Sequence, residues 1–266
     1  MTDSFDVRTY WERRLGHEYS LAGVGYQRLG RHYNAWMYRI RARVFDRVLH
    51  NHGIGLGSNV LDIGTGTGFY IERWHAAGAR SVTGVDITDV AVQALRARHP
   101  TYRFVQADIS TTLPDHDALP PASFEAVSAM DVLFHIVDDD GYRRAFVNIA
   151  SLLKPGGWLI WSDNFLRHGT ERVEHQVSRS LAESEGALRD AGFEIVGRVP
   201  MFVLMNYPSD TRSRLARLAW TAMVAPSALV APLGWVLGAA LYPFERWLTA
   251  TLTESPTTEI MICRKL

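Results

Sequence analysis

The sequence predicts an α/β protein with a doubly wound, mostly parallel sheet of seven strands and helices on both faces. Short hydrophobic runs bounded by glycine or aspartate alternate along the chain with amphipathic stretches of helical period. One of these runs breaks into the glycine-rich stretch LDIGTGTGF at residues 61–69, from which a helix continues. Strands that alternate with helices form parallel sheets, and such sheets bind ligands beyond the carboxyl ends of their strands.

The composition is that of an ordinary folded protein. The 266 residues are 47% hydrophobic and carry a formal net charge of zero, which gives no support for a nucleic-acid partner. The single cysteine, Cys263, excludes an internal disulfide and a cysteine zinc cluster, and we expect it to be buried. Residues 1–14 are charged and have no apolar core, so they do not form a secretory signal. A cytoplasmic location is therefore expected.

The first thirty residues combine scattered aromatic side chains with several glycines. A short helix is predicted over residues 7–15, followed by a loop. This segment is either a loosely packed arm or a lid that closes over a ligand. An amphipathic helix follows from Tyr33, with Asn34 as its cap and Gly53 at its end, and its arginines are expected to face solvent.

The next hundred residues alternate strictly between strand and helix. Strands are predicted at Asn59–Ile63, Ser81–Asp86, 103–107, Phe124–Met130 and 158–162. Helices are predicted at 69–77, at 89–99 with Thr88 as the cap, at 138–153 and at 184–191. Residues 154–157 read as a turn that ends a helix. A strand from Phe193 and a final strand at 258–264 complete the set of seven.

An apolar segment precedes the last strand. Residues 215–244 contain one charged side chain, Arg217, but Pro226, Pro232 and Pro243 interrupt any long apolar helix. Two short hairpinned helices are predicted, and they form plain core, the wall of an apolar pocket or a shallow membrane contact.

Acidic residues follow the first three predicted strands and should meet at one edge of the sheet. Asp86 suits two adjacent ribose hydroxyls, because a carboxylate accepts two hydrogen bonds. Asp108, or the backbone beside it, can take the exocyclic amine of adenine. Asp62, next to the first glycine of the loop, would meet a cation better than a pyrophosphate.

Together these features resemble the class I S-adenosylmethionine-dependent methyltransferases. The acidic residue before Gly-x-Gly-x-Gly matches Asp62 to Gly68, the ribose-binding acid matches Asp86, and the adenine-contacting acid matches Asp108. The segment after the fourth strand matches residues 130–135, and the Leu-Lys-Pro-Gly-Gly turn matches residues 153–157. The resemblance covers residues 32–165 directly and the last strand by its place in order.

The resemblance implies S-adenosylmethionine as cofactor, with S-adenosylhomocysteine as product. The residues expected to bind the cofactor are Asp62, Gly64, Thr65, Gly66, Gly68, Phe69, Asp86, Ile87, Asp108, Ile109, Met130, Asp131 and Tyr33. Together with the patterns outside the matched region, it divides the chain into four expected parts: an arm or lid at 1–30, a Rossmann-like cofactor domain at 31–200, an apolar cap at 201–256 and the terminal strand of the sheet at 257–266.

A nicotinamide dinucleotide fits the loop less well. A dehydrogenase needs Gly-x-Gly-x-x-Gly, whereas here the third glycine comes one residue early and Phe69 takes its expected place. Asp62 would also repel a pyrophosphate.

Methyl transfer to a hydroxyl needs a group that takes its proton. His135 is the first candidate, since imidazole titrates near neutral pH, although a histidine at a helix start also serves as a structural residue. Asp163 is the second candidate. The residues expected to contact the acceptor are Tyr19, Tyr26, His32, Asn164 and Tyr207. The acidic run 138–140 is expected to cap a helix, and no metal is expected.

The sequence therefore predicts an S-adenosylmethionine-dependent methyltransferase that acts on a hydroxyl of a small-molecule, carbohydrate-like or lipid-linked acceptor. Two alternatives stay open. One is a sensor or partner protein that binds the cofactor without transferring methyl groups. The other is a membrane-associated methyltransferase of a lipid or quinone-like substrate, with a peripheral membrane contact through residues 215–244. The acceptor, the methylated atom and the oligomeric state do not follow from the sequence.

Overall fold

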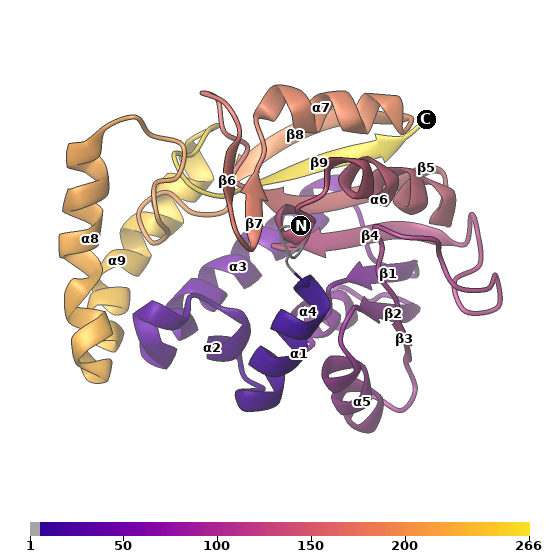
Figure 1. Cartoon of the computed structure of the whole chain (residues 1–266), viewed down its shortest axis with the longest axis horizontal. Coiled ribbons are helices and arrows are strands. Elements are labelled where there is room, and N and C mark those ends of the chain that lie inside the picture. Colours follow the sequence, from indigo (N-terminus) through magenta and orange to yellow (C-terminus); the bar gives the residue numbers. More distant parts are fainter. Residues whose placement is uncertain (1–5) are drawn as a thin grey trace, which may run out of the picture.

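The computed structural model describes residues 6–266, with the backbone alone at positions 229 and 231, and its centre is a seven-stranded sheet (Figure 1). The strand order is β3-β2-β1-β4-β5-β9-β8. The strands are β1 Asn59–Ile63, β2 Ser81–Asp86, β3 Arg103–Gln106, β4 Phe124–Met130, β5 Leu153–Asp163, β8 Phe193–Pro200 and β9 Glu259–Lys265. The first five are parallel, and β9 runs antiparallel to both β5 and β8. The predicted fold class is confirmed.

Helices cover both faces of this sheet and bury two hydrophobic cores. On one face lie α3 Gly30–His52, α4 Phe69–Ala76 and α5 Asp89–Arg98, and on the other lie α6 Asp139–Leu152 and α7 Leu181–Asp190. Fully buried aromatic side chains fill each core, among them Trp74 in the first and Trp161 in the second. Strand order reverses between β1 and β4, which opens a crevice at their carboxyl ends.

Several predictions about helix ends and burial are confirmed. The Thr88 hydroxyl accepts a hydrogen bond from the Ala91 N–H and caps α5, and the Asp138 carboxylate accepts one from the Gly141 N–H and caps α6. Gly53 ends α3 in the left-handed conformation, with φ of 63°. Cys263 is fully buried in β9.

Other local predictions were wrong. Asn34 does not cap α3, which begins at Gly30; its side chain lies buried and binds the backbone of Tyr26 and Gly30 instead. Residues 154–157 are a bulge inside β5, because Phe124 pairs with Leu153 while Ala126 pairs with Trp158. A capping box at Ser180 starts α7 three residues early. The small hairpin of β6 Glu171–Val173 and β7 Gln176–Ser178 was not predicted.

The segment before α3 is largely helical and docks on the sheet edge. It forms α1 Val7–His17, α2 Leu21–Val24 and the 3-10 turn η1 Gln27–Leu29, where the sequence predicted a loop after the first helix. The Arg14 guanidinium ties α1 to α2 by donating to the carbonyls of Gly23 and Gly25 at 2.6 and 2.7 Å. The Tyr19 hydroxyl donates to the Gly66 carbonyl at 2.9 Å, so the segment is held against the glycine loop.

The apolar segment forms a helical hairpin between β8 and β9, with α8 at Arg214–Leu229 and α9 at Ala231–Thr251 (Figure 1, left). The prolines did not shorten the helices, because Pro232 lies in the first turn of α9 and Pro226 and Pro243 are accommodated within helices. At Gly238 of α9, a Cβ atom would lie 2.3 Å from the Trp36 ring of α3, so the two helices pack through this glycine. No helix among the described residues is long and apolar enough to cross a membrane.

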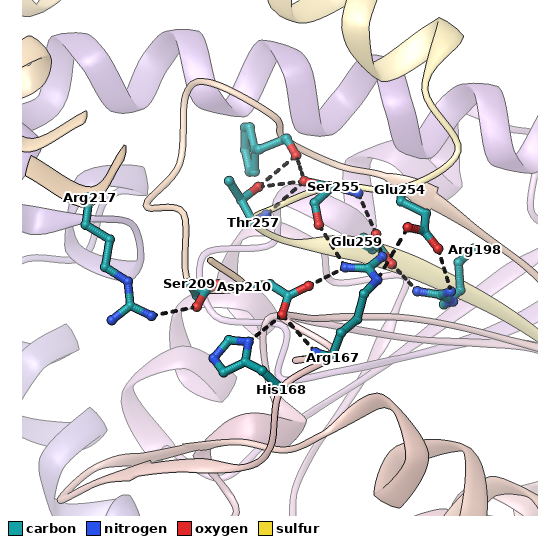
Figure 2. A network of polar contacts seen from close by, with 11 residues as sticks. Arg167, His168, Arg198, Ser209, Asp210, Arg217, Glu254, Ser255, Thr257 and Glu259 are labelled. Carbon is teal, nitrogen blue, oxygen red and sulfur yellow. Dashed lines mark hydrogen bonds and ion pairs between the residues drawn. The ribbon is translucent and has the colours of Figure 1, made fainter. Parts of the chain in front are cut away.

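A buried ion-pair network fastens the ends of this insertion to the sheet (Figure 2). The Arg167 guanidinium binds the carboxylates of Asp210 and Glu259, the latter at 2.8 Å, and Arg198 binds the other oxygen of Glu259 at 2.6 Å. Glu259 is fully buried at the start of β9, and Asp210 lies in the chain that leads into α8. The network therefore connects β9 to both ends of the inserted segment.

Replacing Arg167 with alanine is expected to lower the free energy of unfolding by about 2–3 kcal/mol, because the carboxylates of Glu259 and Asp210 lose a charged donor while buried. Urea denaturation followed by circular dichroism measures this. Arg143→Ala is the matched control, since its exposed pair with Asp140 should contribute less than about 1 kcal/mol. Equal losses in the two variants would contradict a structural role for the network.

Candidate functional site

A cavity of about 770 Å³ opens at the carboxyl ends of β1, β2 and β4. The helix α1 contributes Trp11 and Leu15 to its wall. Residues that the sequence assigned to the cofactor and that line the cavity are Gly64, Thr65, Gly66, Phe69, Asp86, Ile87, Asp108, Ile109, Met130 and Asp131. The structure thus brings together residues from four separate strand ends.

The glycine loop needs its glycines for conformation and for space. Gly64, Gly66 and Gly68 have φ values of 70°, 50° and 84°, a region that strains other residues. A Cβ at Gly64 would lie 2.3 Å from the Val132 side chain. Gly68 stands at the N-cap of α4 without a side-chain cap, so the first-turn N–H groups of the helix can meet a carboxylate.

Asp86 clamps this loop from the end of β2. One carboxylate oxygen accepts the Gly66 N–H at 2.8 Å, and the other accepts the N–H and hydroxyl of Thr88 at 2.9 and 2.7 Å. Burial raises the pKa of this carboxyl, while the three donors oppose the rise. A carboxylate oxygen has two lone pairs, so the oxygen bound to Gly66 keeps one for a ribose hydroxyl.

Asp108 is oriented by a local turn after β3. One carboxylate oxygen accepts the Ser110 N–H at 2.8 Å and the Ser110 hydroxyl at 2.6 Å. The side chain lines the cavity beside Ile87 and Ile109, whose apolar surfaces suit the faces of a flat base.

Asp62 lies beneath the loop and does not line the cavity. One oxygen accepts the Ser128 hydroxyl, which in turn accepts the Trp74 indole N–H at 2.8 Å. The other oxygen, Oδ2, has no hydrogen-bond partner in the described part of the chain. Burial raises the pKa of Asp62 to about 7. A cation close to the loop would stabilise its ionised form, which fits the positive charges of S-adenosylmethionine.

Asp131 follows β4 and faces Arg41 of α3 across the cavity wall. Its backbone has φ of 59°, which is a strained conformation for aspartate. Such a conformation persists only where the surrounding contacts stabilise it. The Ser162 hydroxyl donates to its carboxylate at 2.9 Å, and Arg41 forms an ion pair with the other oxygen. Arg41 is buried, which corrects the expectation that the arginines of this helix face solvent.

His135 lines the cavity, and one of its ring nitrogens is bound to the backbone. Its Nδ1 lies 3.0 Å from the His175 carbonyl oxygen, which can only accept, so Nδ1 carries the proton and Nε2 is left as an acceptor. The Trp11 ring packs edge-on at a centroid distance of 5.0 Å. Burial lowers the pKa of His135 to about 4, so the imidazole is neutral at physiological pH.

Asp163, the second candidate base, does not reach the cavity. It is buried at the end of β5, where one oxygen accepts the Asn164 N–H at 2.6 Å. Burial raises the pKa of Asp163 to about 7. The neighbouring Asn164 side chain donates to the Ser178 hydroxyl at 2.8 Å, so both residues serve local structure.

The remaining expected contacts also lie outside the cavity lining. Tyr33 is fully buried in the core, and its hydroxyl donates to the Met205 carbonyl at 3.1 Å. Tyr26 and Tyr207 pack on Trp220 of α8. The other three are Gly68, Tyr19, whose hydroxyl is bound to the glycine loop, and His32. Aromatic character alone did not distinguish packing from ligand contact.

The sequence suggested that residues 1–30 could close over a ligand, but it did not single out the residues of α1 to α4 that line the cavity. The missed lining residues include Trp11, Leu15, Val24, Tyr38, Arg41 and Tyr70. A signal existed for Arg41, because it falls four residues after Met37 and three before Val44, on the buried stripe of the helix.

Comparison with known proteins points to one family. Residues 60–157 match a family model described as a methyltransferase domain. Over 111 residues the chain is 33% identical to ubiquinone biosynthesis O-methyltransferase of Albidiferax ferrireducens, which covers 40% of this chain and 41% of that relative. The chain spans less than half the length of such curated relatives.

Solved structures share the fold over most of the chain. Magnesium protoporphyrin IX methyltransferase from Synechocystis, with S-adenosylmethionine bound, has a TM-score of 0.59 at 16% identity and covers 100% of both chains. The [4+2]-cyclase SpnF has a TM-score of 0.56 at 23% identity, with 84% of this chain and 80% of that chain covered. At these identities the likeness concerns the fold, and the fold hosts more than one reaction.

Proposed function

We propose, from the premise that residues 60–157 form a class I S-adenosylmethionine-dependent methyltransferase domain, that this chain transfers a methyl group to a hydroxyl of an apolar small molecule. The observation that carries the proposal is the one cavity that the glycine loop, Asp86, Asp108 and His135 all line, with His135 Nδ1 engaged by the His175 carbonyl.

Residues on three strand ends are suited to hold the cofactor. Asp86 accepts the ribose hydroxyls, and Asp108 with the Ile109 backbone takes the polar edge of adenine. The first turn of α4 and the buried carboxylate of Asp62 complement the charged amino-acid end. When bound, S-adenosylmethionine supplies a methyl group that is already activated by its positively charged sulfur.

His135 and the aromatic wall serve the acceptor. The neutral imidazole accepts the hydroxyl proton at Nε2, while its Nδ1–H bond to the His175 carbonyl fixes the ring. Trp11, Leu15 and Val24 give that side of the cavity an apolar surface. Such a surface suits a quinone-like or phenolic acceptor, and the matched relatives named for ubiquinone biosynthesis support this class.

Calorimetric titration with S-adenosylhomocysteine tests the cofactor site first. We expect micromolar affinity, and a parallel titration with NAD should give no heat of binding. Binding of NAD without S-adenosylhomocysteine would overturn the proposal. Uptake of labelled methyl groups from S-adenosylmethionine by a panel of phenols and catechols then tests transfer.

A protein that binds the cofactor without using it is the second candidate. The structural likeness to a [4+2]-cyclase supports this candidate, since proteins with this fold do not all catalyse methyl transfer. Tight binding of S-adenosylhomocysteine together with no methyl uptake by any acceptor of the panel would favour that candidate.

A further inference from the structure

A basic groove is lined by residues of α3 and α9. Figure 1 shows α9 in the helical hairpin at one side of the molecule. The groove has a volume of about 1050 Å³ and lies apart from the candidate active site, with which it shares no lining residue. Four arginines line it, together with two aromatic side chains from α9. These residues are Arg39, Arg43, Arg47, Arg246, Tyr242 and Trp247.

The arginines of the groove lack carboxylate partners. Among the ion pairs of residues 6–266, none includes any of the four. Arg39 stacks on the rings of Trp36 and Trp235, and Arg47 donates to the Thr249 carbonyl at 2.6 Å. The only carboxylate lining the groove within the described residues, Asp46, is paired with Arg73 at 3.2 Å. The groove therefore holds a concentration of uncompensated positive charge.

An exposed apolar stripe adjoins this charge along α9. Leu233, Val236, Phe244 and Trp247 follow one another at helical spacing and are 43%, 62%, 61% and 63% exposed. The opposite side of α9, at Gly234 and Gly238, packs against α3. Trp247 belongs to both the stripe and the groove, so the apolar and basic surfaces are continuous.

We propose that this surface docks the protein on an anionic phospholipid membrane, with the α9 stripe in the headgroup boundary and lipid phosphates in the arginine groove. Tryptophan and phenylalanine at the interface and arginine beside them are the combination that binds anionic lipid. A second copy of the chain fits less well, because it would bring two sets of unpaired arginines together. The docking surface goes beyond the proposed methyl transfer and concerns different residues.

Flotation of the full chain with phospholipid vesicles tests this docking. We expect binding to vesicles of equal parts phosphatidylcholine and phosphatidylglycerol, none to phosphatidylcholine alone, and release at high salt. Trp247→Ser and Arg43→Glu should each weaken partition about tenfold. The matched controls lie on α6, on the opposite face of the sheet: Val147→Ser, at a position 55% exposed, and Arg143→Glu should partition like the wild type.

Three outcomes would overturn the docking surface: no flotation with anionic vesicles, equal losses in the α9 and α6 variants, or a dimer in analytical ultracentrifugation that Trp247→Ser dissociates without any vesicle binding. Circular dichroism on the same variants shows that they are folded, and calorimetry with S-adenosylhomocysteine shows whether they still bind it. The calorimetry also separates the two proposals, because a chain that floats but binds no S-adenosylhomocysteine would retain the lipid surface and lose the proposed methyl transfer.

Discussion

Asp86→Ala is expected to weaken the affinity for S-adenosylhomocysteine about 100-fold, close to 3 kcal/mol. Two effects combine in this loss. The ribose hydroxyls lose a charged acceptor, and the Gly66 N–H loses the carboxylate that holds the glycine loop in place. Isothermal titration calorimetry measures the change directly.

Thr88→Ala is the control for the loop-positioning part of that effect. Its hydroxyl binds the same carboxylate at 2.7 Å but belongs to the cap of α5. We expect less than about a tenfold loss of affinity, because the Thr88 N–H still binds the Asp86 carboxylate and the oxygen that faces Gly66 is unchanged. An Asp86→Ala protein that is folded and binds like the wild type would remove Asp86 from the cofactor site.

His135→Ala is expected to lower kcat about 100-fold with little change in cofactor affinity, because the acceptor hydroxyl loses the group that takes its proton. The acidic side of the wild-type pH profile should be flat down to about pH 5, since burial holds the pKa of His135 near 4 and the ring stays neutral above it. Steady-state kinetics with an acceptor that the protein methylates measure both kcat and its pH dependence.

His135→Asn separates a base from a structural residue. The asparagine amide can still donate to the His175 carbonyl, as Nδ1 does at 3.0 Å, but offers no basic nitrogen in the place of Nε2. If His135 is the catalytic base, both variants should have a low kcat. A normal kcat in His135→Asn would instead mean that His135 has a structural role. Asp163→Asn should keep near-normal turnover, because Asp163 does not line the cavity.

Several strands of the sheet could be predicted closely from the sequence. Strands such as Asn59–Ile63 and Phe124–Met130 are hydrophobic runs with turn residues or acids at their ends, so pattern and boundary agree. The resemblance to methyltransferases is confirmed over residues 60–157, which match the model of a methyltransferase domain.

Errors arose where a local signal competed with tertiary contacts. Asn34 has the chemistry of a helix cap, yet its amide serves the turn at Tyr26, four residues before the helix starts. Asp163 stands at a strand end as the other acids do, but the chain at β5 turns its side chain into the interior. A strand-end position predicts the edge of the sheet and not the direction of one side chain.

Contacts distant in sequence set the rest of the site. Trp11 and Arg41 line the cavity because α1 and α3 pack over the carboxyl ends of the strands. The packing of α1 does not follow from hydrophobic period, since α1 has a single buried residue, Leu15. The wall that faces the acceptor is therefore the part of the site that sequence patterns describe least.

The place of β9 in the sheet constrains the order in which the chain can fold. β8 joins the sheet only through β9, yet the whole α8–α9 hairpin is synthesised between them. During synthesis on the ribosome, β1 to β5 can pair as they emerge. In contrast, β8 stays unpaired until β9 has been synthesised, and the apolar α8–α9 hairpin emerges before β9 does. The Arg167–Glu259 contact is thus a late event of folding, and the nascent chain before it is the species most in need of a chaperone.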